Sequence, residues 1–163
     1  LATIAAAQLS GRMLGRPIVD RLGIEVPSLG AWRWRLEHAS MGLSKRFNEM
    51  LDQNPDRREE LVNRLRLMDA VVHGRKVRVP TLAMLASRDE VAPAPSSAAV
   101  FNAIDSDPGQ KWRFCVPFGH RAGDIANTRR VALFGKALND FFDPSRTPME
   151  SMAGWEAEMR LDA

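Results

Sequence analysis

Residues 77–89 read Val77-Arg-Val-Pro-Thr-Leu-Ala-Met-Leu-Ala-Ser-Arg-Asp89, and the fold class follows from them. From Val77 to Ala86 apolar side chains fall on both faces of a strand, instead of alternating with polar ones. Such a pattern is typical of a strand in a parallel sheet that has helices on each side. The polar residues that begin at Ser87 end the strand, so Asp89 follows it directly.

A second strand is predicted further along the chain. Residues 111–116, Lys-Trp-Arg-Phe-Cys-Val, alternate in the manner of an edge or next-to-edge strand, and they run into Pro117-Phe-Gly-His120. Between the two strands, Ser96 is placed to cap a helix. Strands that alternate with helices indicate the α/β fold class, with an open, mostly parallel sheet covered by helices. In this class the functional sites lie beyond the carboxyl ends of the strands.

In the rest of the chain, the spacing of apolar residues predicts four more helices and one weak strand. The helices cover residues 1–14, 31–51, 55–73 and 128–142, and the strand covers residues 18–26. Residues 31–72 could form a helical cap or lid. We predict one domain over residues 1–142 and a tail or arm over residues 143–163. The chain starts without methionine inside an alanine-rich stretch, which suggests a piece of a longer protein.

The amino-acid composition and charge exclude several classes of function and partner. The 163 residues are 45% hydrophobic, which is enough to bury one core of ordinary size. The net charge of +3 comes from arginines spread along the chain, so we predict no nucleic-acid partner. A single cysteine, Cys115, rules out an intramolecular disulfide and allows the cytoplasmic location that we expect. No apolar run approaches the roughly 20 residues of a membrane helix, so we expect no membrane partner.

Asp89 and His120 are the candidate catalytic residues. They lie 31 residues apart, which leaves room for one loop, one helix and one strand. A carboxylate beside an imidazole can fix its tautomer, so that the second ring nitrogen acts as a base. Glu90 could replace Asp89 as the acid. Taken singly, such an aspartate is more often a turn residue and such a histidine more often structural. Their position after successive strands is what indicates catalysis.

The nucleophile expected with this pair is a serine in a Gly-x-Ser-x-Gly turn between a strand and a helix. No serine of the chain fits this pattern: Ser28, Ser40 and Ser44 each lack at least one flanking glycine. We therefore expect the nucleophile to lie outside this chain, and the isolated chain to be inactive.

The other candidates fit structural roles. His38 lies within a predicted helix and His73 at a helix end, and no metal-ligand spacing links the histidines. No phosphate-binding loop is present either, so we predict neither a metal nor a cofactor. Trp32 and Trp34, each beside an arginine, could stack on a sugar or a base, although such a cluster is more often half-buried packing. Cys115 is interpreted as a small core residue.

Several stretches resemble acetyl xylan esterases and cephalosporin-C deacetylases, which are α/β hydrolases. They are Arg58-Glu-Glu-Leu-Val-Asn-Arg-Leu-Arg-Leu-Met-Asp-Ala70, Val77-Arg-Val-Pro-Thr-Leu82, Asp89-Glu-Val-Ala-Pro-Ala-Pro-Ser-Ser97 and Val100-Phe-Asn-Ala-Ile104. The resemblance covers most of residues 20–142. In this family an Asp-x-x-x-Pro loop supplies the triad acid and a Gly-His motif supplies the base, and these match Asp89 and His120. The chain departs from the family at Arg121, where an acidic residue is common.

The resemblance implies that residues 1–142 are the C-terminal portion of an α/β-hydrolase domain. Leu1-Ala-Thr-Ile-Ala-Ala-Ala7 resembles the helix that follows the family's Gly-x-Ser-Gln-Gly-Gly-Gly turn. The implied function is a serine-type carboxylic ester hydrolase acting on acetylated sugars or similar small esters, and a homo-oligomer is suggested. In it His120 would be the general base and Asp89 would orient it. Dienelactone hydrolases and oligopeptidase-like enzymes share these signals, and a non-catalytic binding module of the same fold is a further alternative.

Overall fold

Three parallel strands form the central sheet. β3 (Leu22–Glu25), β4 (Thr81–Ala86) and β5 (Lys111–Val116) lie side by side in that order. Every residue of β4 is buried, as its continuous apolar pattern predicts. The register places Thr81 opposite Leu22 on one side and opposite Lys111 on the other. The computed structural model describes residues 1–9, 12–13, 16–120 and 125–155.

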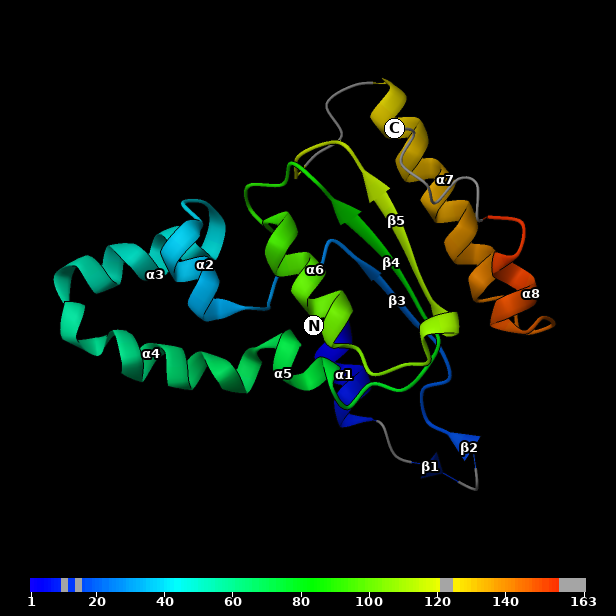
Figure 1. Ribbon diagram of the computed structural model, residues 1–163, viewed down its shortest axis with the longest axis horizontal. Helices are drawn as coiled ribbons and strands as arrows, with labels where there is room; N and C mark the ends of the chain where they lie inside the picture. Colours follow the sequence, from blue (N-terminus) through cyan, green and yellow to red (C-terminus); the bar gives the residue numbers. More distant parts are fainter. Residues whose placement is uncertain (10–11, 14–15, 121–124, 156–163) are drawn as a thin grey trace.

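Helices cover both faces of this sheet (Figure 1). One face carries α7 (Ile125–Phe141), with α8 (Pro148–Met152) beside it. The other face carries α1 (Ala2–Gln8), α5 (Ala70–Gly74) and α6 (Ala94–Ala103). The predicted α/β fold class, with a parallel sheet between helices, is therefore confirmed.

Each face of the sheet has its own hydrophobic core. On the α7 side the core is built on aromatic rings: Phe114 of β5 packs against Phe134 at 5.9 Å between ring centroids, and Phe141 is fully buried. On the α6 side it contains smaller chains, among them Ile24 and Leu85. Burying a large apolar side chain contributes about 1.5–3 kcal/mol, so these two cores fix β4 and β5 in place.

A helical extension, residues 31–69, projects from the sheet (Figure 1). It contains α2 (Trp32–His38), α3 (Gly42–Gln53) and α4 (Arg58–Leu65), with short 3-10 turns at Pro55–Arg57 and Arg66–Met68. These helices enclose a third core of their own, made of Trp32, Leu36, Leu51, Val62 and Leu65. The prediction that residues 31–72 act as a cap or lid stays a prediction.

The helical extension turns more often than its sequence pattern predicts. The helix predicted over residues 31–51 is interrupted between α2 and α3, where Ala39 and Met41 are extended. The interruption folds α3 back so that Phe47 meets the edge of Trp32, 5.5 Å between ring centroids. Gly42 has a φ of +60° and lies against Val91, where a Cβ atom would come within 3.0 Å of the valine side chain. Only glycine adopts this conformation without strain.

The end of α1 and the start of α6 also differ from the predictions. α1 ends at Gln8 instead of near residue 14, and Arg12–Met13 pairs in antiparallel fashion with Arg16–Pro17. Glycine costs a helix about 1 kcal/mol relative to alanine, and positions 11 and 15 both hold glycine. Ser96 does not cap α6, which starts two residues earlier. Its hydroxyl donates instead to the carbonyl of Gly30 at 2.7 Å.

Part of the segment predicted as a tail or arm folds back on α7. Arg21 donates to the backbone carbonyl of Phe141, the last residue of α7, and to those of Asp143 and Arg146 in the turn that follows. Thr147 and Glu150 form a capping box that starts α8, and Met152 is 1% exposed in the α7-side core. None of the described helices is long and apolar enough to cross a lipid bilayer.

Candidate active site

Asp89 lies in the loop after β4, residues 87–93, which we call the acid loop. Its side chain is 0% exposed. Oδ1 accepts hydrogen bonds from the backbone amides of Val91 and Ala92, both at 2.8 Å. Bonds from two amides of its own loop hold the carboxylate in one orientation. The second oxygen, Oδ2, is thereby left to face the end of β5.

His120 lies in the loop after β5, and its ring meets that oxygen. Nδ1 of His120 is 2.9 Å from Oδ2 of Asp89, and 51% of the His120 side chain is exposed. An ionised carboxylate can only accept hydrogen bonds, so this contact requires Nδ1 to donate, and in the neutral imidazole Nε2 would then keep its lone pair. No described residue donates a hydrogen bond to Nε2. The structure thus brings the two predicted site residues together in the geometry that lets an imidazole act as a base.

The two loops leave the sheet side by side because the strand pairing continues beyond the strands. The amide of Ser87 donates to the carbonyl of Val116 at 2.9 Å, and the amide of Arg88 donates to the carbonyl of Phe118 at 3.0 Å. At Gly119 a Cβ atom would lie 3.3 Å from the carbonyl oxygen of Arg88, so a small residue suits this close approach. The backbone itself therefore sets the distance between Asp89 and His120.

The alternative acid and the other histidines lie elsewhere. Glu90 is exposed, and His120 pairs with Asp89 instead. His38 Nδ1 lies 2.9 Å from the carbonyl oxygen of Trp34, and His73 Nε2 lies 2.8 Å from that of Leu67. Among the described residues, no three histidine, cysteine, aspartate or glutamate side chains gather as a metal site would require.

Of the tryptophans and serines singled out by the sequence, Trp32 and Ser44 have packing roles. Trp32 is buried, whereas Trp34 is half-buried and stacks on His38 with 4.7 Å between ring centroids. Ser44 is fully buried and accepts a hydrogen bond from Arg35. Cys115 is half-buried at the margin of the α6-side core, in keeping with its interpretation as a small packing residue.

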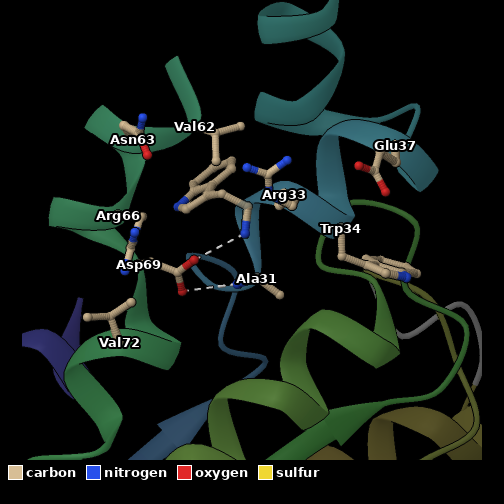
Figure 2. Close-up of a pocket in the computed structure, with 10 residues that line it drawn as sticks. Ala31, Arg33, Trp34, Glu37, Val62, Asn63, Arg66, Asp69 and Val72 are labelled. Atoms are coloured by element: carbon tan, nitrogen blue, oxygen red, sulfur yellow. Dashed lines mark hydrogen bonds between the residues drawn. The ribbon is translucent and has the colours of Figure 1, made fainter. Parts of the chain in front are cut away.

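Two charged residues, Asp69 and Arg35, are buried and make contacts that the sequence did not predict. Asp69 accepts hydrogen bonds from the backbone amides of Ala31, Trp32 and Val71, at 3.0, 3.1 and 2.9 Å. Figure 2 shows the bonds from Ala31 and Trp32. Asp69 thereby joins the start of α2 to the start of α5. An aspartate before a helical run is an N-cap signal that could have identified it. Arg35 is buried under the acid loop, and nothing in a helical pattern distinguishes it from an exposed arginine.

A pocket of about 460 Å³ opens between α2 and α4 (Figure 2). Its lining includes Arg33 and Glu37 from α2, and Asn63 and Arg66 from the opposite side. Arg33 is already engaged, since both of its terminal nitrogens donate to Glu59, at 2.9 and 2.7 Å. Neither residue of the candidate catalytic pair lines this pocket, so it is a feature of the helical extension.

No family model matches the chain, and no curated protein sequence matches it. Solved structures do match. Acetyl xylan esterase 1 from Thermoanaerobacterium sp. JW/SL YS485 aligns with a TM-score of 0.57 and 19% identity, covering 79% of this chain and 39% of that one. The acetyl xylan esterase from Paenibacillus sp. R4 aligns with a TM-score of 0.57 and 17% identity, covering 82% of this chain and 42% of that one. Over the matched part, the chain has the acetyl xylan esterase fold.

This likeness confirms the resemblance at the level of fold. The chain spans about two fifths of the length of these esterases (39% and 42%), so the rest of their structure has no counterpart in it. At identities of 19% and 17% the acetyl xylan esterase fold says nothing by itself about substrate. Function is therefore inferred from the Asp89–His120 pair.

Proposed function

We propose that this chain supplies the acid and the base of a serine-type carboxylic ester hydrolase that removes acetyl groups from sugars or similar small alcohols. The observation that carries the proposal is the 2.9 Å contact between His120 Nδ1 and Asp89 Oδ2, at the carboxyl ends of adjacent parallel strands. The acetyl xylan esterase fold supports it. The serine would come from outside these 163 residues, and at least one backbone amide of the oxyanion hole would lie next to it.

The chemistry assigned to this pair follows from its geometry. Nε2 of His120 would take the proton of the serine hydroxyl as the serine oxygen attacks the ester carbonyl carbon. The imidazolium formed would be stabilised by the buried Asp89 carboxylate, which remains ionised. Nε2 would then return the proton to the leaving alcohol, leaving an acyl-serine. Water, activated by the same nitrogen, would release acetate and regenerate the serine.

The proposal is tested on a protein extended at its N-terminus to include the Gly-x-Ser-x-Gly turn that it requires. Acetate release from p-nitrophenyl acetate and from acetylated xylan would be measured. Asp89→Asn is expected to lower kcat by roughly 10⁴, and His120→Gln by roughly 10⁴–10⁶, which is the scale of the losses when a triad aspartate or histidine is replaced. His38→Gln and Asp52→Asn change exposed residues of α2 and α3 and serve as matched controls. The 163-residue chain alone should release no acetate.

The outcomes separate the competing functions. Ester hydrolysis that survives His120→Gln within about tenfold would contradict the proposed base, since lost general-base catalysis costs at least about 10². An extended protein that binds acetylated xylan without hydrolysing it would favour the non-catalytic module. Faster turnover of a lactone or of a peptide than of an acetyl ester would favour the other α/β-hydrolase classes.

A further inference from the structure

A single buried arginine anchors the acid loop to the helical extension. Arg35 lies on α2 and is 1% exposed. Its Nη2 donates to the carbonyl oxygen of Val91 at 2.9 Å, and its Nε donates to Oγ of Ser44 at 3.1 Å. The guanidinium carbon lies 4.9 Å from the centroid of the Trp32 ring. One side chain therefore ties together α2, α3 and the acid loop.

Val91 is held from both sides by charged groups. Its amide donates to Oδ1 of Asp89, and its carbonyl accepts from Arg35. The same Oδ1 also accepts the amide of Ala92. Because these contacts occupy Oδ1, only Oδ2 faces His120. Movement of the backbone at residue 91 would turn the carboxylate and change its approach to the ring.

Packing alone does not account for an arginine at this position. Burial lowers the pKa of Arg35, and attraction to Asp89 and Asp69 opposes that effect. Its Nη1 is buried, and no described residue accepts a hydrogen bond from it. An apolar side chain of similar volume would fill the same space without the cost of desolvating a charge. An apolar residue would lose the hydrogen bonds to Ser44 and Val91, and only the bond to Val91 reaches the acid loop.

We propose that Arg35 is a positioning residue for the Asp89–His120 pair. Through Arg35, the helical extension holds the acid loop in place. The inference rests on the proposed function of that pair. Arg35 acts through the backbone of Val91 and not through the substrate. Its removal should therefore loosen the acid loop and slow the chemical step, while leaving substrate affinity nearly unchanged.

Amide hydrogen exchange in the 163-residue chain tests the first half of this inference without requiring esterase activity. Arg35→Met keeps an unbranched stem but removes the donors. We expect the amides of Val91 and Ala92 to exchange about tenfold faster, as suits the loss of one charge-assisted hydrogen bond, while β4 amides change much less. Arg33→Met is the matched control, because Arg33 is an exposed residue of the same helix and pairs with Glu59. It should leave both loop amides unchanged.

Arg35→Lys keeps the proposal testable if the methionine variant does not fold. A lysine retains the charge but lacks the planar fork that reaches both Ser44 and Val91, so an intermediate exchange rate is expected. In the extended, active protein, Arg35→Met should lower kcat about tenfold or more with KM within about twofold, and Arg35→Lys should restore part of kcat.

Two results would overturn the inference: loop amides that exchange at the wild-type rate in both variants, or exchange that rises equally in the loop and in β4. If the extended protein shows no esterase activity, the proposed function fails. The exchange rates of the Val91 and Ala92 amides still decide whether Arg35 holds the acid loop.

Discussion

Replacing Asp69 by asparagine should strongly destabilise the protein, because one carboxylate holds three backbone amides. Oδ1 accepts from Ala31 and Val71, and Oδ2 accepts from the buried amide of Trp32. In Asp69→Asn the Trp32 amide would face an NH₂ group, and a buried unpaired donor costs about 1–3 kcal/mol. The two remaining bonds would lose their charge assistance, about half their strength. Together these effects predict a loss of about 3 kcal/mol in the free energy of unfolding.

Urea denaturation followed by tryptophan fluorescence measures this loss directly. With an m-value unchanged from wild type, the transition midpoint should fall in proportion to the lost free energy. Asp52→Asn, at an exposed position of α3, is the matched control and should change stability by less than about 0.5 kcal/mol. A loss below about 0.5 kcal/mol in Asp69→Asn would contradict the role assigned to this carboxylate. It would show that the three amides are satisfied equally well without the charge.

Five further substitutions test the packing around the site, each by urea denaturation. Phe141→Ala should cost about 3–5 kcal/mol because its ring is fully buried, whereas Phe142→Ala, at a position 46% exposed, should cost less than half as much. Gly30→Ala would place a methyl group 2.2 Å from a valine side chain of α6 and should destabilise by about 1–3 kcal/mol. Gly135→Ala, with open space around it in α7, should stabilise by about 0.5–1 kcal/mol. Met152→Ala should cost about 2–5 kcal/mol, and a cost near zero would mean that α8 does not belong to the α7-side core.

The sequence was sufficient to predict the sheet and the candidate pair because both depend on local patterns. A continuous apolar run predicted the buried strand β4, and an alternating run predicted β5. Loops at the carboxyl ends of neighbouring parallel strands meet at one edge, so Asp89 and His120 were expected to meet there. The 2.9 Å contact agrees with that expectation, although it does not test catalysis.

The features that the sequence did not predict depend on contacts between distant residues. The break between α2 and α3 is set by packing of Phe47 on Trp32 and by the approach of Gly42 to the acid loop. The burial of Arg35 depends on Val91, 56 residues further along the chain. A charged residue in a helical pattern is exposed by default, so a single sequence gives no reason to expect otherwise. The fold of residues 143–155 on α7 depends likewise on Arg21, far away in sequence.

Asp89 is expected to hold His120 in the tautomer that leaves Nε2 free to act as a base. The ¹⁵N chemical shifts of the His120 ring, measured at about pH 8, above the ordinary titration range of imidazole, report which nitrogen carries the proton. We predict a protonated Nδ1 and an unprotonated Nε2, with this preference lost in Asp89→Asn. A ring protonated on Nε2, or a tautomer mixture that the Asp89→Asn substitution leaves unchanged, would contradict the account.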